Sequence, residues 1–340
     1  MKRILALILA MLMICFAFAA CSTEEDEDTE GGIDLTVTDS DSVYNTKNEH
    51  NDQFYYDYIN GDEVIITGYA GSHIPHAITV PDVIDERPVT AISACAFLSK
   101  TNVTEVTLPA TVNAIGNMAF AKCSNLTKIN VPDAVISVGD AAFAETAIVE
   151  IKLPATLVTL GESVFANCGE LTKAELPAGK EYMLDPNNPE VETVVSVVPS
   201  KLFMDCTKLA QVTWTSAADR IDAYAFANCK VLTTVPTLSD KAFAIGEFAF
   251  LGCAKIAAVT IPATMTEIGE CAFYGCAELA SVTFTNIISI WDVDHADPNK
   301  VDQRFSAGAD LADLCTVAVV RGIECHPRSE VNGRCQNVES

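Results

Sequence analysis

The chain has 340 residues, of which 49% are hydrophobic and only 20% charged, so it holds enough apolar material for a large core. Wholesale disorder is therefore excluded. Its 46 acidic residues outnumber its 21 basic residues, and the formal net charge is −25. A polyanion of this size repels phosphate backbones, so we expect no nucleic-acid partner.

The N-terminal residues 1–20 are expected to be a lipoprotein signal peptide. A short basic start precedes an apolar run over residues 4–20, and small residues close that run directly before Cys21. This order is typical of a cleaved export signal. Residues 18–21, Phe-Ala-Ala-Cys, resemble the lipobox of bacterial lipoproteins, in which the cysteine becomes the lipid-modified mature N-terminus. An uncleaved membrane anchor is the alternative, because 17 apolar residues reach the lower limit for a span.

Residues 21–52 are expected to form an extended acidic tether. Six acids fall within the seven positions from Glu24 to Glu30, and two glycines follow. Such a segment cannot bury an apolar face, and its charges repel one another. An acidic run after a lipidated cysteine also resembles the surface-export signal of Bacteroidetes lipoproteins, which implies an outer-membrane location facing outward. A plain solvated spacer, as in a Gram-positive lipoprotein, is the alternative.

The body of the chain is an array of sequence repeats about 23 residues long. Residues 115–132 read IGNMAFAKCSNLTKINVP, and similar segments recur at residues 160–177, 245–262 and 268–284. Each repeat carries one phenylalanine at a fixed position, and one gap of 38 residues marks an insertion. The anchoring residues are Phe97, Phe120, Phe143, Phe165, Phe203, Phe226, Phe250 and Phe273.

This repeat length predicts a mainly β solenoid, a right-handed leucine-rich-repeat array of about eight coils with short parallel strands. The pattern Leu-x-x-Ile-x-Val-Pro supplies one strand per coil, and a second apolar run precedes each Ile-Gly. We interpret glycines such as Gly116 and Gly246 as tight turns. We expect one elongated domain over residues 53–284, with an insertion at 178–201 and a C-terminal cap or tail at 285–340.

The array resembles the BspA-like leucine-rich-repeat proteins of bacterial surfaces. The resemblance covers residues 54–284 and includes residues 60–69, NGDEVIITGY, which are similar to the hairpin that caps the first coil in that family. It implies a cell-surface lipoprotein or secreted protein that binds host matrix proteins or other bacteria. No shared catalytic residues come with the family, so the resemblance implies no enzymatic activity.

Most of the 13 cysteines fall on two fixed positions of the repeat. Cys95 and Cys271 lie two residues before a phenylalanine, and six others lie three residues after one. In-register stacking points their side chains in parallel, which disfavours disulfides between neighbours and convergence on a metal ion. We therefore expect a buried ladder of free thiols at Cys123, Cys168, Cys206, Cys229, Cys253 and Cys276. Cys315, Cys325 and Cys335 lie outside the array, and Cys325–Cys335 would close the shortest disulfide loop among them.

Other motifs that carry chemistry are sparse. The five histidines are dispersed, and the sequence has no His-Glu-x-x-His, no Gly-x-Ser-x-Gly and no phosphate-binding glycine loop. Asp292, Asp294 and Asp297 form a weak calcium candidate that lacks the glycine and glutamate of an EF-hand loop, and a solvated acidic turn is the alternative. We predict no cofactor and no catalysis. The alternative is an enzyme or carbohydrate-processing accessory with its chemistry in the insertion or the tail.

The outward positions of the predicted strands differ between the two halves of the array. Charges alternate in the first half, as at Glu105 and Lys128, and are expected to form cross-strand pairs. The second half is uncharged and rich in hydroxyls. The β-propensity of threonine explains this pattern without a function. The functional interpretation is a docking surface for an extracellular protein or glycan, on a monomer that touches the membrane only through its lipid. The candidate contacts are Gln211, Thr213, Thr234, Thr260, Ser281 and Thr283.

Overall fold

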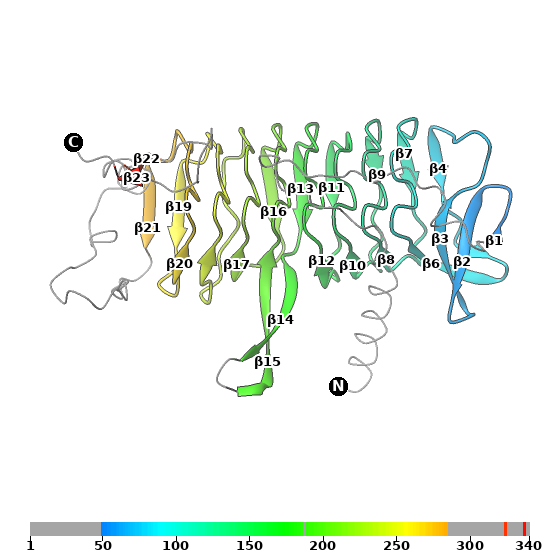
Figure 1. Ribbon diagram of the computed structural model, residues 1–340, viewed down its shortest axis with the longest axis horizontal. Helices are drawn as coiled ribbons and strands as arrows, with labels where there is room; N and C mark the ends of the chain where they lie inside the picture. Colours follow the sequence, from blue (N-terminus) through cyan, green and yellow to red (C-terminus); the bar gives the residue numbers. More distant parts are fainter. Residues whose placement is uncertain (1–48, 186–187, 285–322, 325–335, 338–340) are drawn as a thin grey trace. The chain divides into compact units, whose positions relative to one another are not determined.

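The computed structural model describes residues 49–185, 188–284, 323–324 and 336–337 (Figure 1). The chain divides into two compact units, Met1–Glu170 and Leu171–Ser340. In the described part of each unit, every regular element is a β-strand. Within these ranges no helix has the length and apolar character needed to cross a membrane. The expected signal peptide and nearly all of the expected tether and tail lie outside the described residues.

The first unit begins with a cap of antiparallel strands. The chain reverses at Asn60 (φ 52°) and Gly61 (φ 81°), both in the left-handed region that glycine and asparagine tolerate. The hairpin therefore forms where the resemblance placed it. Its second strand then pairs in parallel with the first coil, so that the cap continues directly into the solenoid. The cap strands are β1 (Glu49–His50), β2 (Phe54–Ile59) and β3 (Glu63–Tyr69).

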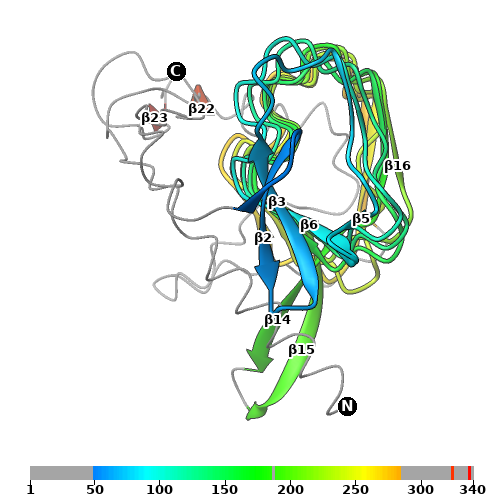
Figure 2. The same ribbon diagram turned by 90° about the vertical axis from the view of Figure 1, so that its right-hand side faces the viewer.

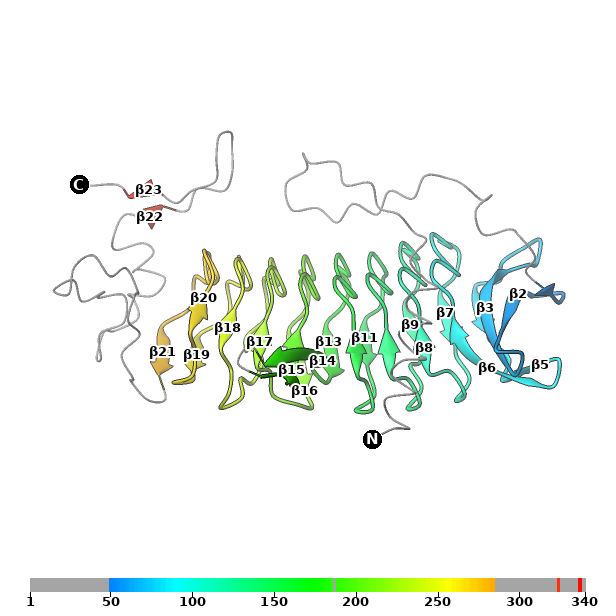
Figure 3. The same cartoon turned by 60° about the horizontal axis from the view of Figure 1, so that its bottom comes forward.

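Each coil of the first unit contributes a first strand and a second strand, and equivalent strands of neighbouring coils stack as parallel ladders (Figure 3). The register advances by one repeat, so Glu105 faces Lys128 and Ala114 faces Ser137. The first strands are β4 (Ala77–Thr79), β7 (Glu105–Thr107), β9 (Lys128–Ile129) and β11 (Glu150–Lys152). The second strands are β6 (Arg87–Ile92), β8 (Ala114–Ile115), β10 (Ser137–Val138) and β12 (Thr159–Leu160), and β5 (Val83–Ile84) pairs antiparallel with β6.

The interior of each coil is filled by its strand residues and its phenylalanine. Phe97, Phe120, Phe143 and Phe165 are completely buried, and successive ring centroids lie 5.2, 5.7 and 5.6 Å apart with nearly parallel planes. A side chain at the same position of every coil must repeat at roughly the 4.8 Å strand spacing, and offset stacking relaxes that distance slightly. The phenylalanine ladder is therefore a direct consequence of the repeat.

The third side of each coil is a ribbon of consecutive tight turns. Residues two before and two after each phenylalanine adopt left-handed backbone, for example Met118 (φ 52°) and Lys122 (φ 59°) around Phe120. The amides of these three residues donate to carbonyls of the next coil at 2.7–2.9 Å. Every left-handed residue other than glycine costs roughly 1–2 kcal/mol, which these inter-coil hydrogen bonds offset.

The glycine that precedes the ribbon is required by close approach of two backbones, and our interpretation of it as a tight turn is wrong. Neither Gly116 nor Gly246 has positive φ. A Cβ on Gly116 would lie 2.5 Å from the nitrogen of Ala94, and a Cβ on Gly246 would lie 2.5 Å from the nitrogen of Ala223. Real Cβ atoms do not approach so closely, so a side chain at Gly116 or Gly246 would force the neighbouring coil to shift.

The second unit contains four more coils, anchored by the other four phenylalanines. The strand β21 (Ser281–Phe284) then begins a further coil. The solenoid therefore has about nine coils, where phenylalanines alone count eight. Its first strands are β13 (Lys173–Leu176), β16 (Gln211–Trp214), β19 (Ala258–Ile261) and β21 (Ser281–Phe284). Its second strands are β17 (Arg220–Ile221), β18 (Ala244–Ile245) and β20 (Glu267–Ile268). A short antiparallel pair is formed by β22 (Ile323–Glu324) and β23 (Gln336–Asn337).

The first-strand ladder of the second unit is interrupted between β16 and β19. Residues 232–237 of the intervening coil form no strand. Their sequence places Pro236 at the repeat position that Thr213 and Thr260 occupy in the neighbouring coils. Proline has no N–H to donate, so a strand in the middle of a ladder does not form at this position.

The insertion expected at residues 178–201 is a β-hairpin. Its strands β14 (Gly179–Asp185) and β15 (Asn188–Val198) pair antiparallel and project away from the coils of the second unit (Figures 1 and 2). The far end of β15 belongs to the solenoid, because Val197 and Val198 are buried and pair in parallel with β17. The Arg220 guanidinium fixes the base by ion pairs at 2.8 Å to Glu181 and 2.6 Å to Asp222.

Candidate binding surface

The six predicted contact residues all have exposed side chains on the first-strand side of the second unit. Gln211 and Thr213 lie on β16, Thr260 lies on β19, and Ser281 and Thr283 lie on β21. Thr234 lies in the strandless segment between β16 and β19. The expected continuous face is therefore two patches, and the interruption at Pro236 separates them.

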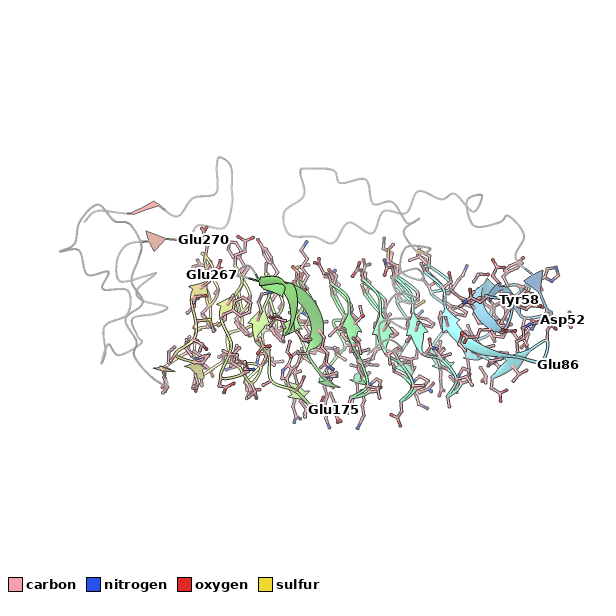
Figure 4. All side chains as sticks on the ribbon, turned by 90° about the horizontal axis from the view of Figure 1, so that it is seen from below. Asp52, Tyr58, Glu86, Glu175, Glu267 and Glu270 are labelled. Atoms are coloured by element: carbon pink, nitrogen blue, oxygen red, sulfur yellow. The ribbon has the colours of Figure 1, made fainter. Side chains whose placement is uncertain are left out.

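The two patches differ in their charged neighbours. On β16, Gln211 faces Lys173 and Thr213 faces Glu175, so charges flank that patch. Figure 4 shows Glu175 projecting from this edge of the unit, whereas Glu267 and Glu270 project from the opposite edge.

The other patch lies on β19 and β21 and carries no charge. Thr260 faces Thr283, and Ala258 faces Ser281, in adjacent parallel strands. Lys255, which precedes β19, forms an ion pair with Glu278, which precedes β21. We name Ala258, Thr260, Ser281 and Thr283 the hydroxyl patch.

The first unit offers a direct comparison on its equivalent strands. Lys128 and Glu105 form the expected cross-strand ion pair, with the ammonium nitrogen 2.6 Å from the carboxylate oxygen. Their side chains are 74% and 42% exposed, so the pair contributes little to stability. On β4 and β7, Thr79 and Thr107 are exposed and face one another in the same register as Thr260 and Thr283.

The cysteine ladder is confirmed. Its six members are buried, and none of them forms a disulfide. For five of them the thiol donates a hydrogen bond to the carbonyl of a phenylalanine one coil earlier, at 3.0 Å from Cys123 to Phe97 and 3.1 Å from Cys168 to Phe143. Burial raises the pKa of Cys123 and of Cys168 to about 11 and that of Cys253 to about 12. A thiol held neutral in this way is neither a nucleophile nor a metal ligand at physiological pH.

The second cysteine column lies on the turn ribbon and behaves differently. Cys95 and Cys271 have left-handed backbone, with φ of 57° and 52°. Cys95 is half-buried and forms no disulfide, whereas Cys271 is disulfide-bonded. The repeat pattern places the two residues correctly but gives no indication that one of them is oxidised.

Sequence reasoning missed a polar and aromatic cluster in the cap. The hydroxyls of Tyr56 and Tyr58 donate to one carboxylate oxygen of Asp85 at 2.7 and 2.8 Å. These bonds lower the pKa of Asp85. The guanidinium of Arg87 lies 4.7 Å from the centre of the Tyr58 ring. Figure 4 labels Tyr58 and also Glu86, the residue that follows Asp85 in the chain. The cluster fastens the β5–β6 turn to the hairpin, which gives it a structural role.

The remaining candidates from the sequence carry no site in the structure. No group of three or more His, Cys, Asp or Glu residues able to hold a metal ion occurs in the part of the chain that the structure describes. The weak calcium candidate, Asp292, Asp294 and Asp297, lies outside the described residues. The same is true of the lipidation site Cys21 and of Cys315, Cys325 and Cys335.

Comparison with known proteins identifies the family. The model of the BspA type leucine rich repeat region matches six copies, over residues 90–185 and 192–293. A T. pallidum leucine-rich-repeat protein is 25% identical (68% of this chain, 91% of that chain, TM-score 0.47). A leucine-rich-repeat protein from Bacteroides ovatus is 22% identical (69% and 76%, TM-score 0.45). A leucine rich cell surface protein from Faecalibacterium prausnitzii is 19% identical (72% and 97%, TM-score 0.26). The curated proteins contain no match to this chain.

The family model covers more than half of the chain, and its two matched ranges span most of the repeat array. The glycine column, the phenylalanine ladder and the cysteine ladder repeat within both units. The chain belongs to the BspA-type leucine-rich-repeat proteins.

Proposed function

We propose that this protein is a lipid-anchored protein of the bacterial cell surface that binds an extracellular protein or glycan and performs no catalysis. The observation that carries the proposal is the hydroxyl patch of the second unit. In a chain of net charge −25, this patch presents exposed threonine and serine side chains on two paired strands without a charge among them.

The energetics of binding favour this patch over the rest of the first-strand side. Burying a charge without a partner costs several kcal/mol, roughly, whereas a hydroxyl exchanges water for partner groups at little net cost. The ion pair of Glu105 and Lys128 would have to be desolvated on docking. The hydroxyls of Thr260 and Thr283 would not impose that penalty.

The scaffold behind the patch is rigid, which reduces the entropy lost on binding. Val259 and Val282, the inward neighbours of the patch, are buried. Phe250 precedes β19 and Phe273 precedes β21, and the rings of these two neighbouring coils stack at 5.1 Å. Strands held in this way keep their outward hydroxyls at fixed spacing before any partner arrives.

The surface location rests on the N-terminal sequence. The lipobox-like residues before Cys21 and the acidic tether that follows favour a solenoid outside the membrane, attached by lipid alone. The acidic tether resembles the surface-export signal of Bacteroidetes lipoproteins, which supports the outward-facing side of an outer membrane as the location.

A binding screen tests the proposal. The soluble fragment 33–340 is presented to matrix proteins, to glycans and to other bacteria, and in parallel to a broad panel of hydrolase substrates. Saturable binding to one ligand class without turnover supports the proposal. Turnover of any substrate would favour the enzyme alternative, with chemistry in the insertion or the tail. Failure to bind any ligand class would contradict the assignment as a binding module.

A further inference from the structure

One coil of the second unit is hydrogen-bonded to both neighbouring coils on two of its sides. Its second strand, β18, pairs in parallel with β17 and with β20. On the ribbon side, the Phe226 amide of the coil before donates to the Ala249 carbonyl at 2.8 Å. The Phe250 amide donates in turn to the Ala272 carbonyl of the coil after, at 2.7 Å. The first-strand side of this coil is residues 232–237, which form no strand. We name this segment the Pro236 break.

The Pro236 break forms few backbone hydrogen bonds with the strands on either side of it. Among the described residues, none of residues 233–236 donates or accepts a backbone hydrogen bond, and the Leu232 amide bonds to Cys229, three residues earlier. Bonding to the preceding coil resumes at the Thr237 carbonyl, which accepts from the Ala218 amide at 2.9 Å. By contrast, four residue pairs join β13 to β16, and four join β19 to β21. The ladder of first strands is therefore open on both sides of this segment.

The packing of the break is also shifted relative to the next first strand, β19. Val235 is half-buried, whereas Val259 at the same repeat position is buried. Thr237 is exposed, whereas Ile261 is buried, and Pro236 lies in the interior between them. The segment therefore lacks both the ladder and the inward alternation that hold the other first strands in place.

We propose that the Pro236 break is a hinge of the second unit. The coils before and after it stay bonded through the second strands and the ribbon, so the first-strand side opens and closes about those two sides. The strands on each side of the hinge move as groups, because β13 is paired with β16 and β19 with β21.

This hinge changes the separation between the two patches of predicted contact residues. Thr213 lies before it, on β16, and the hydroxyl patch lies after it, on β19 and β21. A partner that contacts both patches has to fix their separation, which costs conformational entropy, whereas the spacing within the hydroxyl patch is already fixed. The hinge therefore favours the hydroxyl patch alone as the contact surface. Its existence does not depend on the proposed function.

Two matched pairs of spin labels on the full mature chain test the hinge without any ligand. Gln211 and Ala258 occupy the same repeat position two coils apart, on opposite sides of the break. Ala77 and Lys128 are also two coils apart at one position, and both pair with Glu105 in a continuous ladder. All four labelled side chains are exposed. At the usual strand spacing the backbones of each pair lie about 10 Å apart, within the range of dipolar broadening in frozen solution.

The measured quantity is the width of the distance distribution between nitroxides attached through noncanonical amino acids. We expect the pair across the break to give a distribution at least twice as wide as the pair across the continuous ladder. Equal widths for the two pairs would overturn the proposal.

A repaired variant tests whether the proline creates the hinge. Pro236→Thr with Thr237→Ile gives residues 235–237 the sequence Val-Thr-Ile of β19, with the missing amide restored. We expect this variant to narrow the distribution across the break to the width of the continuous ladder. The control Thr237→Ile keeps the proline and should leave the distribution wide. A repaired variant with the wild-type width, or equal narrowing by the control, would overturn the assignment of the hinge to Pro236.

Discussion

The buried thiol ladder predicts that the first unit loses stability at alkaline pH. Cys123 and Cys168 have a folded pKa of about 11, against 9.0 for an exposed thiol, because burial penalises the thiolate. The folded pKa is raised, so the stabilisation is complete below pH 9 and is lost as the pH rises from 9 to 11. Over that interval the unfolded chain ionises while the folded chain does not.

The magnitude follows from the two pKa values. One pH unit above the unfolded pKa, at pH 10, ionisation lowers the free energy of the unfolded chain by roughly 1–2 kcal/mol per cysteine. Cys123 and Cys168 together therefore reduce the free energy of unfolding by about 3 kcal/mol between pH 8 and pH 10. This is a large share of the 5–15 kcal/mol, roughly, that stabilises a typical domain.

The assay is urea unfolding followed by circular dichroism at pH 8, 9 and 10 in deoxygenated buffer. The double variant Cys123→Ala with Cys168→Ala should be less stable at pH 8, because it loses two thiol hydrogen bonds and leaves small cavities. Its stability should nevertheless fall by about 3 kcal/mol less than that of the wild type between pH 8 and pH 10. The same pH dependence in both proteins would refute the reasoning, since tyrosines and lysines titrate equally in the two.

Three further predictions concern the coils, the insertion and the anchor. Gly246→Ala should lower the free energy of unfolding in urea by about 1–3 kcal/mol, because the new Cβ would meet the preceding coil. The control Gly169→Ala should leave the free energy of unfolding unchanged, because no atom lies within 4 Å of its Cβ position. Equal effects of the two variants would contradict the close-approach explanation. Replacing residues 183–193 by Asn-Gly should preserve cooperative unfolding, because the projecting part of the hairpin lies outside the core and loop length has little effect on stability. Loss of cooperative unfolding would show that this segment belongs to the core. Cys21→Ser should move the protein to the aqueous phase of a detergent partition, and retention in the detergent phase would favour an uncleaved anchor.

The repeat explains why the fold was predictable. A residue that recurs at one position of every coil, such as Phe120, must stack on its equivalents once the coils stack, and the same holds for Cys123. The solenoid, its strand pattern and the thiol ladder therefore follow from spacing alone. The spacing also located the insertion, at the one long gap.

Features that occur only once in the chain were harder to predict from the sequence. The hairpin form of the insertion depends on pairing between β14 and β15, which a single copy cannot reveal by repetition. The oxidised state of Cys271 is not shared by Cys95 at the same repeat position, so repetition could not reveal it. The break at Pro236 was readable in principle, because the proline comes two residues early in its coil.

The role of the glycine column was not predicted, for a different reason. Sequence reasoning treats glycine as a source of left-handed backbone, but the left-handed positions of this ribbon are occupied by residues such as Met118 and Phe248. Glycine is placed instead where two backbones meet, as at Gly116. Contact between coils is a tertiary property, so it cannot be inferred from the sequence of one repeat alone.

The central claim, that the hydroxyl patch contacts the partner, is tested most directly by two matched double variants measured against the ligand from the screen. Thr260→Lys with Thr283→Lys places two charges on adjacent strands of the patch, and Thr79→Lys with Thr107→Lys does the same in identical register on the first unit. We expect the first pair to weaken binding at least tenfold, about 1.4 kcal/mol, and the second pair to leave Kd unchanged, while both proteins keep their melting temperature. Equal loss of affinity from both pairs, or no loss from the first, would contradict it.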